Sequence, residues 1–165
     1  MSIYTVNLIW WLLTKRANTN NRFVKRAYSF IARCLLNKNG SYIGSGAVIK
    51  EQPIFPHGIN GILISSGAEI GKGSVIFHQV TIGSNNIGDS NKIGSPTIGD
   101  NCYIGAGAKI IGNINIGKNV RIGANAVVVK DVRDNSVVVN QPARVIEKDG
   151  EMNNQYYGNG QLKSS

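Results

Sequence analysis

The chain is short of the residues on which several kinds of chemistry depend. Among its 165 residues are two cysteines, two histidines and four prolines. Two cysteines cannot build a disulfide scaffold or an all-cysteine zinc site, and one copy of the chain cannot supply three imidazole ligands. We therefore expect a reducing, cytoplasmic compartment and no bound metal. The length suits one domain of ordinary size or one short repeat array.

Acidic residues are missing from the first 50 positions. Residues 1–50 hold eight Lys or Arg, and the first acidic residue is Glu51. Residues 51–165 hold ten basic and nine acidic residues, so the net charge of +9 belongs almost wholly to the N-terminal segment. Its basic and aromatic residues do not interleave as in a known nucleic-acid module, and we expect no nucleic-acid partner.

Long apolar runs are also missing. The segment Ile3 to Leu13 contains Trp10 and Trp11, but it is too short to span a bilayer, and no cation precedes it as in a signal peptide. It predicts a first helix. A second helix is indicated by an apolar stripe at three- and four-residue spacing, with basic residues elsewhere: Phe23, Val24, Ala27, Tyr28, Ile31, Cys34 and Leu35.

Two interpretations fit these helices. Residues 1–40 are expected to cap the open end of the structure that follows, because a repeat array needs its end covered. The alternative is a peripheral anchor, in which residues 1–38 contact the inner face of the cytoplasmic membrane through apolar side chains and cations.

From residue 43 onward the chain repeats with a period of six. Ile64, Ile70, Ile76 and Ile82 stand six apart, and ten Ile-Gly dipeptides occur between Ile43 and Gly123. The residue four places after each marker is usually small or apolar. This period fits a short strand followed by a sharp turn, three of which form one triangular coil with the marker and the fourth residue inside. We expect a parallel β-helix of about five coils.

The same phase places Cys102 inside the coil. Buried cysteine behaves as a small apolar residue, whereas a reactive thiol needs an exposed, electropositive setting. Cys34 lies on the apolar stripe of the second helix, and we therefore expect no covalent thiol catalysis.

The phase breaks at two places. Three residues are inserted between Phe55 and Ile64, and four are added between Ile82 and Ile98. A regular solenoid carries its functional variation in such excursions.

Both histidines occupy the third place of a hexad. His57 and His78 are 21 residues apart, which is one coil of eighteen plus the inserted three. We expect them to lie side by side on adjacent coils, pointing outward near a corner. A neutral imidazole suits the removal of a proton from an alcohol near neutral pH, so His57 is predicted to be a general base and His78 a second catalytic residue. The other possibility for each is a surface histidine bonded to a turn carbonyl.

Four segments carry a family resemblance: Phe55–Ile64, Ile76–Gly83, Ile98–Gly112 and Asn140–Val145. Together with the hexapeptide pattern they resemble the left-handed β-helix acetyltransferases, in the serine acetyltransferase branch and closest to its relatives in capsule and exopolysaccharide biosynthesis. The resemblance covers about residues 41–146. It implies an all-β, left-handed parallel β-helix as the catalytic domain (41–146), after the α-helical cap (1–40) and before a flexible tail (147–165).

The resemblance also implies the site. His57 is the family's catalytic base, and acetyl-CoA binds as co-substrate in a groove between subunits of a homotrimer. The groove would be lined by Gly105, Ala106, Ala124 and Asn125, whose short side chains let the cofactor approach. Lys130 and Arg144 would contact its phosphates, or else be solvated surface charges. Tyr42, Glu51 and a backbone carbonyl are candidates for the group that orients His57.

Three departures from serine acetyltransferases bear on the acceptor. Tyr42 stands where a carboxylate orients the base, Pro56 replaces the acid before the catalytic histidine, and Ser95 precedes Pro96 where an Arg-His pair is usual. We therefore predict transfer of acetyl to a hydroxyl of a sugar or polysaccharide precursor. The alternatives are a serine O-acetyltransferase and a non-catalytic β-helix scaffold or binding protein. A γ-type carbonic anhydrase is disfavoured because it needs a third histidine.

Overall fold

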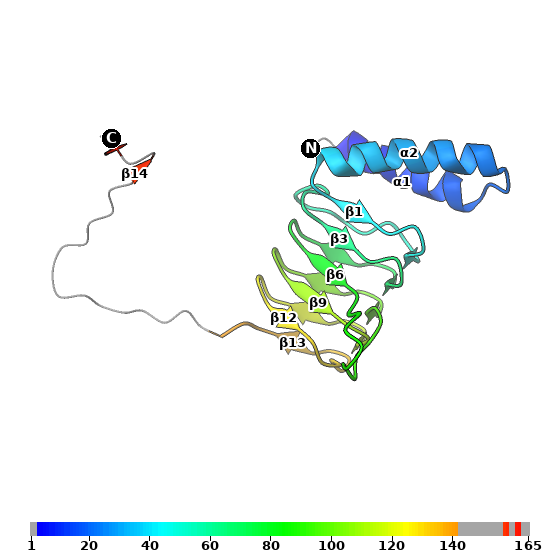
Figure 1. Ribbon diagram of the computed structural model, residues 1–165. Helices are drawn as coiled ribbons and strands as arrows, with labels where there is room; N and C mark the ends of the chain where they lie inside the picture. The colour runs from blue at the N-terminus through cyan, green and yellow to red at the C-terminus, as the bar shows by residue number, and fades with distance from the viewer. Residues whose placement is uncertain (1–2, 142–156, 159–160, 163–165) are drawn as a thin grey trace.

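The computed structural model describes residues 3–141, 157–158 and 161–162. Two helices open the chain, α1 (Ile3–Ala17) and α2 (Arg22–Lys38), and short strands follow. Figure 1 shows the strands stacked in successive coils, with the two helices lying across the N-terminal end of the stack. Helix α1 continues four residues past its predicted end at Leu13.

Three parallel sheets receive the strands in rotation. The first contains β1 (Tyr42–Ile43), β3 (Leu63–Ile64), β6 (Thr81–Gly83), β9 (Lys109–Ile111) and β12 (Val127–Val128). The second contains β2 (Val48–Ile49), β4 (Glu69–Ile70), β7 (Thr97–Ile98) and β10 (Asn115–Ile116). The third contains β5 (Val75–Ile76), β8 (Tyr103–Ile104), β11 (Arg121–Ile122) and β13 (Val137–Val138). The result is a triangular parallel β-helix. Strands β14 (Tyr157–Gly158) and β15 (Gln161–Leu162) form a separate antiparallel pair.

The hexad markers point into the coils. Ile64, Ile82 and Ile110 are register partners in the first sheet, and all three are fully buried. The fourth residue of the hexad is buried as well, as at Ala68 and Val80. The inward phase predicted from the repeat is therefore confirmed, and these side chains form one continuous apolar column.

One corner of the stack is built from asparagines. Asn101, Asn119 and Asn135 each have a positive φ of 56–57°, a conformation that asparagine tolerates better than most residues. The side-chain amide of Asn101 donates to Oδ1 of Asn119 at 2.8 Å, and that of Asn119 donates to Asn135 at 3.0 Å. This ladder joins the same corner of three consecutive coils.

The helix pair covers the open end of the stack. Ile9 of α1 and Leu36 of α2 are buried and belong to the same hydrophobic cluster as the coils. Arg16 donates from Nη2 to the backbone oxygen of Ser45 at 2.7 Å, which ties α1 to the first coil. The predicted domain boundaries at residues 40 and 146 stay predictions, because residues 142–156 lie outside the described part of the chain.

Two excursions interrupt the stack where the phase breaks. In the first, Gly58 and Gly61 adopt positive φ angles of 70° and 64°. In the second, between β6 and β7, Asn85 and Gly94 exchange two backbone hydrogen bonds of 2.8 and 2.9 Å. Lys92 of this segment pairs with Asp131 at 3.2 Å, so the second excursion is fastened to the last coils.

Candidate active site

The two histidines meet at one corner, on adjacent coils. Ile54 bridges Val75, so the segment that ends in His57 runs in register with the segment that ends in His78. Nδ1 of His57 lies 2.9 Å from Nδ1 of His78, and the ring centroids are 4.9 Å apart. One of these nitrogens donates a proton and the other accepts it. The pair therefore leaves Nε2 of His57 as the nitrogen available to a substrate.

Aromatic and backbone contacts hold the pair in place. The ring of Phe77 meets the His57 ring edge to face at a centroid distance of 5.1 Å, and Tyr103 packs on Phe77. The side-chain amide of Asn60 donates to the backbone oxygen of His57 at 2.8 Å. The N–H of Gly107 donates to the backbone oxygen of His78 at 3.0 Å. The backbone of His78 is thus held by the next coil, and that of His57 by Asn60 of its own excursion.

The group that orients His57 differs from the candidates predicted from the sequence. The sequence suggested Tyr42, Glu51 or a backbone carbonyl, but the ring's partner is His78. The Glu51 carboxylate instead accepts the N–H of Gly73 at 3.0 Å. The 21-residue spacing placed the imidazoles side by side, yet only side-chain geometry reveals that their Nδ1 atoms face each other.

The four residues expected to bind the cofactor lie at the same corner in the coils that follow. Parallel register aligns Ile76 with Ile104 and Ile104 with Ile122, which puts His78, Ala106 and Ala124 at one place in successive coils. Asn125 donates its N–H to the Ala106 oxygen at 2.8 Å. Successive coils are about 4.8 Å apart, so this column of short side chains runs roughly 10 Å along the stack from the His57–His78 pair.

Gly105 stands beside this column with no room for a side chain. A Cβ atom there would lie 2.7 Å from the backbone nitrogen of Ala124. The close approach of two coils therefore requires glycine at position 105, and no side chain projects from this position beside the column. Lys130 follows β12 and is exposed, while Arg144, the other predicted phosphate partner, lies outside the described residues.

Lys109 is a cation at this corner that sequence reasoning missed. Its Nζ atom donates to the backbone oxygen of Gln79 at 2.7 Å, and Gln79 itself has a positive φ of 60°. The hexad phase indicates only that Lys109 faces outward, because this residue directly precedes a marker. The contact fixes the turn that follows His78.

Cys102 is buried, as the repeat predicts. Burial is the main cause that raises the pKa of its thiol, and the negative charges of Asp100 and Asp134 act in the same direction. The thiol donates to the backbone oxygen of Gly117 at 3.1 Å. A protonated, buried thiol is unsuited to nucleophilic attack. Among the described residues, no group of three or more His, Cys, Asp or Glu side chains could hold a metal ion.

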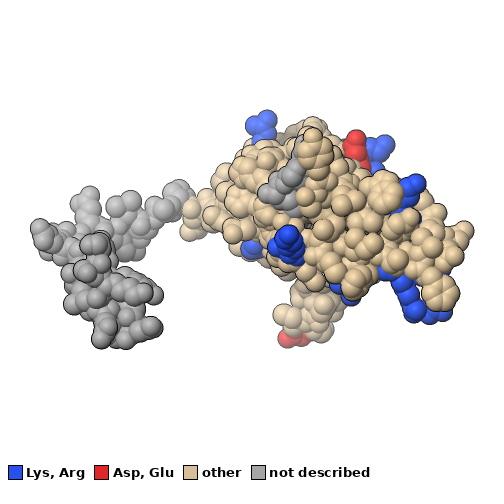
Figure 2. All heavy atoms as spheres, turned by 90° about the horizontal axis from the view of Figure 1, so that it is seen from above, with Lys and Arg blue, Asp and Glu red and all other residues tan. Residues whose placement is uncertain are grey.

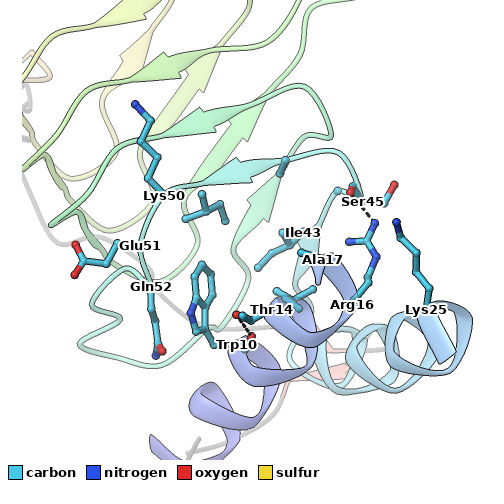
Figure 3. Close-up of a pocket in the computed structure, with 14 residues that line it drawn as sticks. Trp10, Thr14, Arg16, Ala17, Lys25, Ile43, Ser45, Lys50, Glu51 and Gln52 are labelled. Atoms are coloured by element: carbon cyan, nitrogen blue, oxygen red, sulfur yellow. Dashed lines mark hydrogen bonds between the residues drawn. The ribbon is translucent and has the colours of Figure 1, made fainter. Parts of the chain in front are cut away.

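A large cavity lined by described residues lies elsewhere. It measures about 620 Å³ and opens between α1 and the first coil, with Trp10, Leu13, Ile43 and Lys50 among its lining residues. Figure 3 shows Trp10 and Thr14 of α1 facing Ile43 across this space. None of the predicted catalytic or cofactor residues lines the cavity. At their own corner, His57 is exposed and His78 is half-buried.

Known proteins resemble the chain well beyond its repeat. The family model described as "Bacterial transferase hexapeptide (six repeats)" matches residues 95–130. A serine acetyltransferase of Mycobacterium tuberculosis is 39% identical over 145 residues, which cover 88% of this chain and 59% of the relative. One from Helicobacter pylori is 39% identical over 127 residues, which cover 77% of this chain and 71% of the relative. The chain belongs to the serine acetyltransferase family.

Solved structures agree with this assignment. A Neisseria gonorrhoeae serine acetyltransferase, solved in complex with serine, superposes with a TM-score of 0.61 and 34% identity, covering 81% of this chain and 55% of that one. The left-handed parallel β-helix with two N-terminal helices is confirmed as the fold. The chain spans 59% and 49% of the lengths of the relatives from M. tuberculosis and Synechocystis, so most relatives carry additional sequence.

These findings correct the predicted acceptor. The predicted sugar or polysaccharide acceptor is wrong, and the capsule and exopolysaccharide branch is not supported, because the curated relatives are serine acetyltransferases at 36–42% identity. Tyr42, Pro56 and Ser95 differ from the family pattern, but the similarity extends over the whole β-helix. A carboxylate at position 42 is not needed to give the His57 ring a partner, because His78 provides one.

Proposed function

We propose that this protein is a serine O-acetyltransferase, which moves an acetyl group from acetyl-CoA to the side-chain hydroxyl of serine. The observation that carries the proposal is the His57–His78 pair at the head of a column of short residues, in a chain of the serine acetyltransferase family. A base and a row of short side chains leading away from it are what a direct transfer between two bound substrates requires.

His57 is the general base in this mechanism. When Nδ1–H of His57 donates to Nδ1 of His78, the lone pair of Nε2 faces the substrate. His57 takes the proton of the serine hydroxyl while the oxygen bonds to the acetyl carbon. The carbon–sulfur bond then breaks, and His57 returns the proton to the departing thiolate. The products are O-acetylserine and CoA, and no covalent enzyme intermediate is needed.

His78 is a positioning residue. As an acceptor it fixes the productive tautomer of His57 and the direction of its ring, as a carboxylate does in many histidine-dependent enzymes. It also offers a hydrogen bond to the imidazolium that forms during transfer. Because the side chain of His78 is itself neutral in this role, it stabilises that imidazolium less than a carboxylate would.

Acetyl-CoA fits the column as an extended ligand. Gly105, Ala106, Ala124 and Asn125 present backbone and short side chains along it, and Lys130 and Arg144 remain the proposed partners of the phosphates. The groove is completed by a neighbouring subunit in the proposed homotrimer. The outer side of the first sheet supports such an assembly, because it exposes Tyr42, Leu63 and Val127.

A thiol-release assay tests the proposal. The purified protein, given acetyl-CoA, should release free CoA much faster when L-serine is present than with a panel of sugars. Mass spectrometry of the acceptor should show O-acetylserine. Release that does not depend on serine would reject the proposal. Mass measurement by light scattering tests the homotrimer separately. The predicted cytoplasmic location stays a prediction.

A further inference from the structure

Helix α2 has an apolar side that nothing in the described structure covers. Its buried residues, Ala32 and Leu36, face the β-helix and α1. At about 100° per residue, the opposite side carries an exposed stripe, which we call the outer stripe: Phe23, Ala27, Phe30, Ile31 and Cys34. Phe23 is 80% and Phe30 69% exposed. Two exposed phenylalanines on one helix face are unusual for a surface turned to water.

Cations border the outer stripe. Arg22, Arg26 and Arg33 fall together on the helical wheel, beside Phe30, and all three are exposed. In the described residues the one ion pair is Lys92–Asp131, so these guanidinium groups have no acidic partner there. Figure 2 looks onto the helix end of the molecule and shows Lys and Arg around a mainly uncharged face.

The positive charge of the N-terminal segment distinguishes among the partners that could cover the outer stripe. Residues 1–50 hold eight cations and no acid, so a second copy docked through the same face would bring like charges together. An acidic partner removes this repulsion. Nucleic acid would use the arginines but leave Phe23 and Phe30 in water. A bilayer with anionic headgroups accepts both, because the apolar side chains enter the acyl boundary while the arginines meet phosphates.

We propose that α2 docks this protein on an anionic lipid bilayer through the outer stripe and its bordering arginines. The helix would lie parallel to the membrane, since none of the helices in the described part of the chain is long and apolar enough to cross one. Because the helices lie across one end of the stack, the coils would project from the bilayer (Figure 1). The proposal does not depend on which acceptor the enzyme uses.

Co-sedimentation of the full chain with vesicles tests the proposal. The protein should sediment with vesicles of equal phosphatidylglycerol and phosphatidylcholine and stay in solution with phosphatidylcholine alone. The variant R22Q/R26Q/R33Q should weaken binding to the anionic vesicles by roughly a hundredfold, at about fivefold per cation. The variant F23S/F30S should bind at least tenfold more weakly.

Matched changes at the other end of the stack are the controls. K118Q/R121Q/R133Q removes three exposed cations near the last coils, and V137S removes an exposed apolar side chain of β13. Both should bind like the wild type. All variants change exposed residues, so their thermal unfolding should match the wild type, and their activity in vesicle-free solution should be unchanged.

Four results would overturn the proposal. One is wild-type protein that stays in solution with anionic vesicles. Another is an equal loss of binding in the K118Q/R121Q/R133Q control, which would mean that net charge alone acts. The third is a fall in particle mass for F23S/F30S, measured by light scattering, which would identify a second copy as the partner of the stripe. Binding to a nucleic-acid duplex that F23S/F30S leaves unchanged would likewise assign the arginines to another partner.

Discussion

Nδ1 of His57 lies 2.9 Å from Nδ1 of His78, so one imidazole is the hydrogen-bond partner of the other across two coils. Only one of the two tautomeric arrangements leaves Nε2 of His57 free to accept a proton. The identity of residue 78 therefore controls how often His57 is in its productive form.

Replacement of His78 tests this control. His78→Ala removes the acceptor, and we expect kcat to fall by about ten- to a hundredfold with little change in the KM for acetyl-CoA. His78→Gln supplies an amide oxygen that can accept the Nδ1–H of His57, so it should recover most of the lost kcat. Steady-state kinetics of both variants check this. Equal losses in the two would mean that His78 only fills space.

The column of short residues predicts a specific defect in cofactor binding. Ala124→Leu places a bulky side chain on the groove, and Ala124 is exposed, so the fold should tolerate it. We expect the KM for acetyl-CoA to rise at least tenfold while the unfolding temperature stays within a few degrees. Ser66→Leu makes a similar change at an exposed turn on another corner and serves as the control. An unchanged KM in Ala124→Leu would place the cofactor elsewhere.

Gly105→Ala should damage the fold itself. The new Cβ atom would lie 2.7 Å from the nitrogen of Ala124, so two coils must separate. Overpacking of this kind costs about 1–3 kcal/mol, and urea unfolding should show a loss of this size. Gly88→Ala is the matched control, because nothing lies within 4 Å of its Cβ position. A Gly105→Ala protein as stable as the control would refute the close approach.

The two thiols should differ in reactivity. Cys34 is exposed, whereas burial raises the pKa of Cys102 and keeps it protonated. An aromatic disulfide reagent should titrate one thiol per chain in the native protein and two after unfolding. Since the thiolate of Cys102 is disfavoured in the folded state, stability should fall as the pH rises above the ordinary thiol pKa, and Cys102→Ala should lessen this fall. The same variant should keep its activity, which contradicts any thiol mechanism.

Asp131 links the second excursion to the last coils. The N–H of Asn115 and the ammonium of Lys92 lower the pKa of Asp131. A lowered pKa contributes stability that is present above the unfolded-state value and is lost as the pH falls through the folded-state value. Asp131→Asn should therefore lower the urea midpoint slightly at pH 7, and the difference from wild type should vanish in acid. A difference independent of pH would point to another cause.

Much of the fold could be predicted from the sequence, because the repeat determines which residues point inward. The hexad phase correctly buries Ile82, Val80 and Cys102, and the 21-residue spacing correctly brings His57 beside His78. The buried side of helix α2 was harder to predict. The structure buries Ala32 and Leu36, which lie outside the predicted apolar stripe. The members of that stripe are exposed or half-buried: Phe23, Val24, Ala27, Tyr28, Ile31, Cys34 and Leu35. Which part of a broad apolar face is covered depends on the tertiary contact with α1.

The acceptor could not be predicted from single positions. Tyr42 and Pro56 differ from the family pattern, but one side chain seldom defines a substrate when a neighbour can take over its role. Here His78 provides the contact that a carboxylate at position 42 was expected to make. The similarity of the whole β-helix to serine acetyltransferases, at 36–42% identity, was the stronger guide.

Serine-dependent release of CoA, measured for the wild type and for His57→Gln, tests the central proposal most directly. His57 is exposed, so its replacement should leave the fold and CoA binding intact. The account predicts rapid release with L-serine for the wild type and a loss of at least a hundredfold for the variant. Activity of His57→Gln within a few-fold of the wild type, or no serine-dependent release by the wild type, would contradict it.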